Sequence, residues 1–427
     1  MAGYLANMVK GFIVPREKAI LQQARENRPI DSTHGKMIKF EHDQDPGLIR
    51  VLSSLERLIP RALEWPGVQI RHIRQPETHA GGVRILCLDG GGVRGLFSAL
   101  VLEAVMEAVR RIDTPDNPDA PKPCDYFDLI CGTSTGGLLA IMLGRLRMDV
   151  RSAVREYRGL SSDIFKKSAW TVLGKQWWDA YWNKPWFSGQ GLETATRGLL
   201  DEYLSVQEKE ELEGRGIAPG DAPLRPSRDR TGTEKCRTFV CALPEGERQC
   251  HRFRSYMPAS NFPGTDCAIW EAARATSAAP LYFPPITIEG CAYFDGGMES
   301  NNPILEAIRE VGQEFPMAHP TAVVSIGCGS SSPSSPGGGL VSLIDSVVQR
   351  VTDTEAKHTA FLEQFPGMRD SYFRLQETEG LGAIDLAAWE RLGDIEKHAR
   401  VYIQSAQGQS DIQRCAMKLA KSVPGER

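Results

Sequence analysis

The segment GTSTGG, residues 132–137, holds a serine in surroundings that suit a nucleophile. It follows an apolar run and precedes a second apolar run that reads as a helix. Gly132 and Gly136 stand two positions before and after Ser134, and only glycine leaves room for the backbone of so tight a strand-to-helix turn. Such a turn lifts the Oγ of Ser134 above a sheet, at the helix end that favours an oxyanion. The segment predicts a nucleophilic serine; a plain glycine-rich helix entry is the alternative.

A second glycine cluster, DGGGVRG, runs from Asp89 to Gly95 directly after the apolar run ILCL. Its spacing fits G-x-G-x-x-G, the pattern of dinucleotide-binding loops, which also requires a further strand and an acidic residue ~20 positions on. The region that follows reads as a helix carrying Glu103 and Glu107, without a strand between. We therefore expect no nucleotide cofactor, and an oxidoreductase is a disfavoured hypothesis.

The same cluster suits the binding of an oxyanion. The backbone amides of Gly90, Gly91 and Gly92 would donate to negative charge formed at Ser134, and each such bond lowers an acyl-transfer barrier by roughly 3–4 kcal/mol. Arg94 would stabilise that charge or anchor the loop, and a surface salt bridge is the alternative.

A nucleophilic serine needs a general base, and the segment AYFDGGMESNNP offers a carboxylate. Asp295 ends an apolar strand and is followed by Gly296 and Gly297, a layout that presents a carboxylate at a sheet edge. A carboxyl pKa near ~4 is low for a base, but burial and a direct hydrogen bond to the serine would raise the basicity. An Asp-Gly turn that only reverses the chain is the alternative. The histidines after the serine lie in polar, loop-like segments and are weaker candidates: His251, His319, His358 and His398.

Alternating strands and helices must position these residues. The sequence predicts strands at 83–89, 126–132, 236–243, 291–295 and 321–329, and helices at 96–112 and 138–146. The strands are nearly all apolar, which is typical of a sheet buried on both faces. We therefore expect an α/β fold with a mostly parallel central sheet.

The three motifs DGGGVRG, GTSTGG and DGG (295–297), with ARATSAAPLYFPP (273–285), resemble those of the patatin-like phospholipase family. The resemblance spans about residues 83–330, with the motifs in family order. It implies a three-layer α/β/α fold and hydrolysis of lipid acyl esters by a Ser–Asp dyad without a metal or other cofactor. Ser134 would be the nucleophile and Asp295 the base, and the glycine loop with Arg94 would bind the oxyanion.

Composition divides the chain into three parts. Residues 1–80 are polar with scattered helical periodicity, typical of a helical N-terminal arm. Residues 81–330 would form the catalytic domain, and 331–427 a linker and a C-terminal helical extension packed on the core. Within the catalytic domain we expect a cap segment at about 165–190 and a solvated loop insertion at 208–235.

Tryptophans concentrate in the predicted cap, within residues 170–187. Tryptophan is enriched where one end of a side chain is apolar and the other wet, as at bilayer interfaces. We expect Trp177, Trp178 and Trp182 to contact the lipid surface; packing of these indoles on the core is the alternative.

Bulk properties limit the partners. The net charge of −4 provides no basic field for nucleic acid. No apolar run approaches the ~18–20 residues that span a bilayer, and the first residues lack the apolar stretch of a signal peptide. We expect a cytoplasmic protein with peripheral membrane contact. Cys236, Cys241, Cys250 and His251 match no familiar zinc spacing, so we expect no metal.

The leading hypothesis is a lipid acyl hydrolase, either a phospholipase A-type enzyme or lysophospholipase, or an acylglycerol lipase. Its substrate would be a lipid at a membrane surface. An acyltransferase or thioesterase would use the same dyad, and a non-catalytic lipid-binding signalling module is the candidate from another class.

Overall fold

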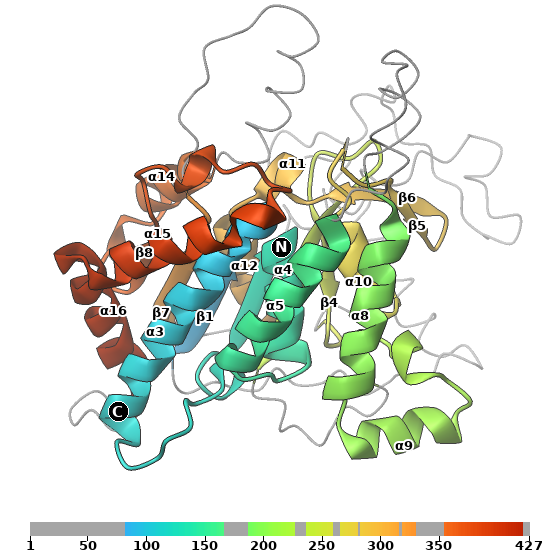
Figure 1. The fold of residues 1–427 in the computed structure, drawn as a ribbon, viewed down its shortest axis with the longest axis horizontal. Coiled ribbons are helices and arrows are strands. Elements are labelled where there is room, and N and C mark those ends of the chain that lie inside the picture. The colour runs from blue at the N-terminus through green and yellow to red at the C-terminus, as the bar shows by residue number, and fades with distance from the viewer. Residues whose placement is uncertain are drawn as a thin grey trace, which may run out of the picture. The chain divides into compact units, whose positions relative to one another are not determined.

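A mixed eight-stranded sheet runs through the middle of the described chain (Figure 1). The computed structural model describes residues 82–165, 187–226, 236–258, 265–280, 282–315, 318–329 and 354–421. The predicted N-terminal arm (1–80) and the predicted lipid contacts Trp177, Trp178 and Trp182 lie outside these residues.

Parallel strands make up most of the sheet. In spatial order they are β3 (Arg237–Pro244), β2 (Leu129–Thr133), β1 (Val83–Leu88), β7 (Pro320–Ile326) and β8 (Tyr372–Leu375). Beyond β3 the direction reverses, because β4 (His251–Arg254) and β6 (Cys291–Asp295) pair with β3 antiparallel, and β5 (Ile286–Ile288) pairs with β6. The carboxyl ends of β1 and β2 therefore open at the same edge, where parallel sheets bind their ligands.

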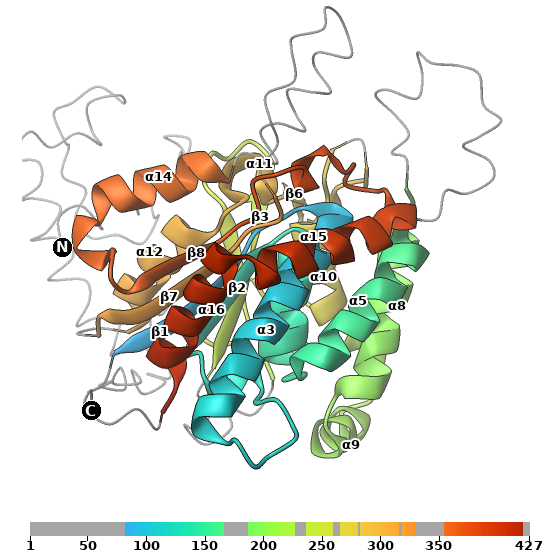
Figure 2. The ribbon, with the colours of Figure 1, turned by 60° about the vertical axis from the view of Figure 1, so that its left-hand side comes forward.

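Helices cover both faces of this sheet. One face carries α3 (Gly95–Asp113), α4 (Thr135–Ala140), α5 (Val150–Phe165), α8 (Gly189–Tyr203), α10 (Ile269–Thr276), α15 (Leu392–Gln404) and α16 (Ala406–Leu419). The other face carries α12 (Ile304–Glu314) and α14 (Glu355–Gln364). Figure 2 shows α3, α5 and α16 in front of the sheet and α12 behind it, with α14 at the upper left. Among the residues that the structure describes, none of the helices combines the length and apolar character that crossing a bilayer requires.

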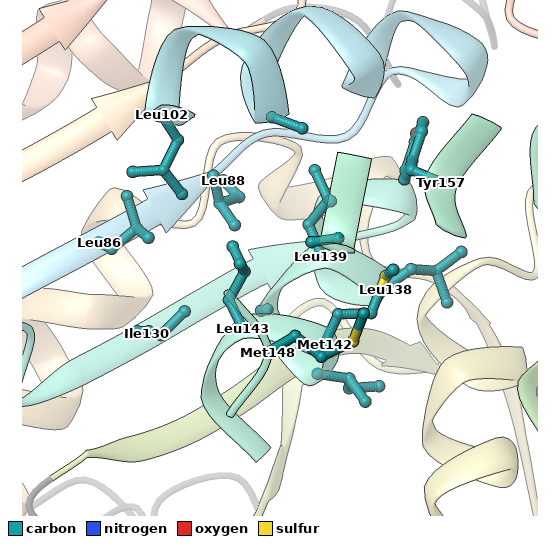
Figure 3. Packing of buried hydrophobic residues seen from close by; sticks show 14 of the residues in the cluster. Leu86, Leu88, Leu102, Ile130, Leu138, Leu139, Met142, Leu143, Met148 and Tyr157 are labelled. Carbon is teal, nitrogen blue, oxygen red and sulfur yellow. The ribbon is translucent and has the colours of Figure 1, made fainter. Parts of the chain in front are cut away.

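The alternation of side chains along β1 accounts for the two layers. Leu86 and Leu88 belong to the apolar cluster under α3, whereas Ile85 and Cys87 belong to the cluster under α12. Every second side chain of a strand points to the same face, so a strand that is apolar on both faces needs a layer of helices on each side. Figure 3 shows Leu86 and Leu88 facing Leu102 of α3. These observations confirm the predicted three-layer α/β/α fold.

Two elements differ from the sequence prediction. The C-terminal extension is not only helical, since it adds the strand β8 to the sheet. The stretch 208–235, predicted as a loop insertion, begins inside the helix α9 (Val206–Gly214). The Oγ of Ser205 accepts a hydrogen bond from the amide of Glu208 (3.2 Å) and caps α9, while Arg145 forms an ion pair with Glu208. A cap and a buried ion pair therefore outweigh the charged composition of this helix.

Replacing Leu102 with alanine should lower the free energy of unfolding by about 2–5 kcal/mol, because the cavity left between α3 and the sheet cannot fully collapse. Urea denaturation followed by circular dichroism measures the change. Val206→Ala on α9, where the side chain is 70% exposed, is the control and should stay within about 0.5 kcal/mol of the parent protein. Equal small effects of the two changes would contradict the packing of α3 on the sheet.

Candidate active site

Ser134 occupies a strained turn between β2 and α4. Its φ of 55° and ψ of −129° lie in a region that costs a residue with a side chain on the order of 1–3 kcal/mol. The amide of Ser134 donates to Thr276 Oγ1 (2.9 Å), and that hydroxyl donates to the carbonyl of Cys241 (2.6 Å). The turn is therefore held by α10 and β3 as well as by its own strand and helix.

Gly132 and Gly136 have no Cβ, and the turn around Ser134 has no room for one at either position. A Cβ on Gly132 would overlap the carbonyl of Gly136, and a Cβ on Gly136 would overlap the carbonyl of Leu88 at the end of β1. Backbone atoms cannot yield as a flexible side chain can. The glycines thus let β1, β2 and α4 meet closely around Ser134.

Asp295 meets Ser134 from the neighbouring part of the sheet. It is the last residue of β6, which pairs with β3, and its amide donates to the carbonyl of Ala278 (3.0 Å). One carboxylate oxygen, Oδ2, accepts a hydrogen bond from Ser134 Oγ (2.6 Å), and the other, Oδ1, accepts one from the amide of Gly297 (2.7 Å). Both oxygens are fixed, one by the hydroxyl and one by the turn that follows the strand.

The environment of Asp295 makes its carboxylate unusually basic. The residue is fully buried, and burial raises its pKa to about 7, although the hydrogen bonds from Ser134 and Gly297 favour the charged form. No cation within the described chain forms an ion pair with this carboxylate. Such a group can take a proton near neutral pH.

The three amides of the glycine loop are not equivalent. The amide of Gly90 donates to the carbonyl of Asn301 (3.1 Å), and that of Gly91 to Thr135 Oγ1 (3.2 Å). Within the residues that the structure describes, the amide of Gly92 has no acceptor. Of the three predicted oxyanion donors, Gly92 is therefore the one whose N–H is available to a ligand.

Arg94 is buried and anchors the loop. Its Nε donates to the carbonyl of Gly91 (3.3 Å) and its Nη1 to the carbonyl of Gly382 (3.1 Å). The surface salt bridge considered from the sequence is wrong, because only 2% of Arg94 is exposed and its partners are carbonyls. The anchoring interpretation agrees with these contacts.

The other motif residues support the loop. Asp89 is fully buried and forms an ion pair with Arg374 (2.7 Å), and a Cβ on Gly95 would overlap the hydroxyl of Tyr157. Gly296 lies against the carbonyl of Cys241 in β3.

Sequence reasoning did not identify Arg374, Thr276, Thr135 or Asn301. Thr135 follows Ser134 directly in GTSTGG, and Thr276 lies within ARATSAAPLYFPP. Asn301 lies in AYFDGGMESNNP, the segment that also holds Asp295. Their position next to the candidate residues is the signal that could have found them. Nothing in the sequence around Arg374 points to Asp89.

The histidines take other roles. His251 packs against Phe253 and Tyr293, and burial lowers its pKa to about 4. His358 is hydrogen-bonded to Tyr372 and His398 to Glu377. None of the hydrogen bonds of Ser134 or Asp295 within the described chain involves a histidine. The described residues also contain no group of three or more His, Cys, Asp or Glu that could hold a metal ion.

The chain is similar in sequence to several named proteins. The chain is 28% identical over 390 residues to calcium-independent phospholipase A2-gamma of Mus musculus, covering 88% of this chain and 45% of that protein. It is 30% identical over 285 residues to patatin-like protein 4 of Arabidopsis thaliana, covering 60% of this chain and 62% of that protein. It is 31% identical over 246 residues to a cGAMP-activated phospholipase of Vibrio cholerae, covering 57% of this chain and 61% of that protein. The chain thus spans about half the length of the mouse relative.

A family model described as patatin-like phospholipase matches residues 86–308. The match covers just over half of the 427 residues and includes Asp89, Ser134 and Asp295. The resemblance noted from the motifs is confirmed: the chain belongs to the patatin-like phospholipase family.

Proposed function

We propose that the protein is a lipid acyl hydrolase that cleaves carboxylic esters of membrane lipids, with Ser134 as nucleophile and Asp295 as general base. The observation that carries the proposal is the 2.6 Å hydrogen bond from Ser134 Oγ to a buried carboxylate without a cation. Relatives named as phospholipases support a lipid ester as the substrate class.

The first step forms an acyl-enzyme. Asp295 Oδ2 takes the proton of Ser134 Oγ while the Oγ attacks the ester carbonyl carbon, which gives a tetrahedral intermediate. The hydrogen bond already in place leaves little reorganisation for the proton transfer. The amide of Gly297 holds Asp295 Oδ1 and so keeps the other oxygen aimed at the hydroxyl.

Negative charge on the former carbonyl oxygen needs donors near the serine. The amide of Gly92 and the amides of Thr135 and Gly136, the first two residues of α4, would supply them. Arg94 contributes by fixing the carbonyl of Gly91, which belongs to the same peptide group as the Gly92 amide.

Collapse of the intermediate releases the alcohol, either a lysolipid or an acylglycerol, which takes the proton held by Asp295. Water then enters, gives a proton to the same carboxylate and attacks the acyl carbon of the acyl-enzyme. As the C–O bond to Ser134 breaks and the fatty acid leaves, Asp295 returns that proton to Ser134 Oγ, which restores both residues. An acyltransferase would use an alcohol and a thioesterase a thioester at the same atoms, so a product assay with competing acceptors separates these activities from hydrolysis.

Ser134→Ala and Asp295→Asn should each reduce hydrolysis of phospholipid vesicles and of a soluble short-chain ester by about 10³-fold or more, because each removes half of the nucleophile–base pair. Fatty-acid release measures the rate. A fluorophosphonate probe should label Ser134, located by mass spectrometry, in the parent protein and in neither of these two variants. Ser162→Ala on α5, a hydroxyl bonded within its own helix turn (2.9 Å), is the control and should keep full activity. An adduct on another residue would reject the proposed nucleophile.

Activity should follow the ionisation of Asp295. Only the carboxylate form accepts the proton of Ser134, so kcat/KM on a soluble ester should rise tenfold per pH unit below pH 6 and level off above the pKa of about 7. Initial rates from pH 5 to 9 with constant ionic strength provide the profile. A rate that is flat across this range would exclude Asp295 as the base.

Asp295→Asn should also change how stability depends on pH. In the folded protein Asp295 holds its proton up to about pH 7, whereas its ordinary pKa is 3.8, so the folded state binds more protons between these values. Ionisation of Asp295 therefore lowers the stability of the parent protein as pH rises from about 4 to 7, by an amount on the order of 4 kcal/mol, and the asparagine variant lacks this contribution.

Thermal unfolding at pH 5 and pH 8 tests this difference. The midpoint of Asp295→Asn should exceed that of the parent protein at pH 8, and the gap should shrink at pH 5. A gap that is independent of pH would mean that Asp295 has no raised pKa.

A further inference from the structure

The segment 372–386, which we term the C-terminal brace, contacts the glycine loop 89–94 although it lies outside the residues matched to the family. The contacts are an ion pair between Arg374 Nη2 and Asp89 Oδ2 (2.7 Å), a hydrogen bond from Arg94 Nη1 to the carbonyl of Gly382 (3.1 Å), and one from the amide of Val93 to the carbonyl of Leu386 (2.8 Å). The brace thus holds both ends of the loop.

The sheet explains how Arg374 reaches Asp89 from two strands away. Arg374 of β8 stands opposite Ser325 of β7, and Ser325 stands opposite Cys87 of β1. Ser325 is small, so the arginine side chain can pass over β7, where its Nη1 donates to Ser325 Oγ (2.9 Å). Its Nη2 then meets Asp89, the residue directly after β1.

Burial makes this ion pair important to the loop. Asp89 is fully buried and the Arg374 side chain is 8% exposed. A buried carboxylate that loses its partner is penalised by several kcal/mol, so the pair constrains the position of Asp89. Thr354 Oγ1 (3.1 Å) and Glu355 Oε1 (3.0 Å) also lie within hydrogen-bonding distance of Nη2 and help to keep the guanidinium in place.

The second end of the brace lies against Gly92. The carbonyl of Leu386 accepts from the amide of Val93 and occupies the space that a Cβ on Gly92 would need. Gly92 has a φ of 57°, which a residue with a side chain adopts at a cost. Gly92 therefore lacks a side chain for two reasons: the turn of the loop has a positive φ there, and the brace packs directly against its backbone.

The contact of Gly382 with Arg94 also affects the amide of Gly92, the proposed oxyanion donor. Arg94 also binds the carbonyl of Gly91 through its Nε (3.3 Å) and its own amide (3.1 Å). The Gly91 carbonyl and the Gly92 N–H belong to one planar peptide group, so fixing the carbonyl fixes the direction of the N–H.

We propose that the C-terminal brace positions the amide of Gly92 for the reaction, and that Arg374 is the positioning residue at the Asp89 end of the loop. This inference rests on the function proposed above. Arg374 acts through Asp89 and does not touch the reacting atoms.

The experiment compares full-length Arg374→Met, Arg374→Lys and the double variant D89N/R374M with the parent protein. Kinetics on a soluble short-chain ester give kcat and KM, and hydrogen exchange followed by mass spectrometry gives the protection of the peptide that contains residues 89–96. The double variant leaves no buried charge unpaired and so keeps the test valid if the single change prevents folding. Arg391→Met is the matched control, because Arg391 pairs with Asp394 on the surface of the same C-terminal region (2.8 Å).

We expect kcat of Arg374→Met and of the double variant to fall on the order of 10²-fold with KM unchanged, as for a misplaced transition-state donor. Arg374→Lys should recover part of kcat, since it keeps a charge beside Asp89. The amides of residues 89–96 should exchange faster in Arg374→Met, and Arg391→Met should match the parent protein in every measurement.

Folded Arg374 variants that keep kcat within about threefold of the parent protein, or change KM alone, overturn the inference. Unchanged exchange in 89–96 overturns it as well. A parent protein without esterase activity rejects the proposed function instead, and the exchange measurement then decides by itself whether Arg374 positions the loop.

Discussion

The hydrogen bond between Ser134 and Asp295 is the contact on which the remaining features of the site depend. It joins two parts of one sheet: Ser134 follows the parallel strand β2, whereas Asp295 ends the antiparallel strand β6. The strand β3 lies between them and pairs with both. β6 pairs only with the last residues of β3, so its final residue Asp295 lies opposite Ala242. The preceding residue of β3, Cys241, pairs with Thr133, and this register brings the end of β6 beside the turn after β2.

Two buried aspartates of this site show how a partner sets the role of a carboxylate. Asp89 and Asp295 are both fully buried. Asp89 faces the guanidinium of Arg374, which stabilises its charge and ties it to the backbone scaffold. Asp295 faces a hydroxyl and an amide, which orient it without neutralising it. Burial raises the pKa of both, to about 6 for Asp89, where the guanidinium favours the charged form, and to about 7 for Asp295, which has no cation beside it.

Local patterns allowed much of the architecture to be predicted. The strands β1, β2, β3, β6 and β7 are mostly apolar runs that are followed within three residues by a glycine or an acidic residue, so both the apolar pattern and the flanking residues indicate them. The strand β8 has four residues with Arg374 among them, and a short strand with a charged residue carries no such pattern. The helix α9 was missed because its charges suggested solvent, although Ser205 and Glu208 form a capping pair.

Candidate residues were easier to predict than their partners. Ser134 and Asp295 lie in motifs whose glycines indicate a tight turn, and in the structure their side chains are hydrogen-bonded. The pairing of Arg374 with Asp89 joins residues 285 positions apart, and no local spacing encodes such a contact. The unequal roles of the Gly90, Gly91 and Gly92 amides depend on acceptors from α4 and from Asn301, which only the assembled fold provides.

The edge position of β8 has a consequence for biosynthesis. A ribosome makes the chain from its N-terminus, so Asp89, Ser134 and Asp295 emerge before Arg374 and Leu386 do. Parallel pairing between segments so distant in sequence forms late in folding, because a long loop must close first. The glycine loop of a nascent chain thus lacks the supports from Arg374 and Leu386 until translation has passed residue 386.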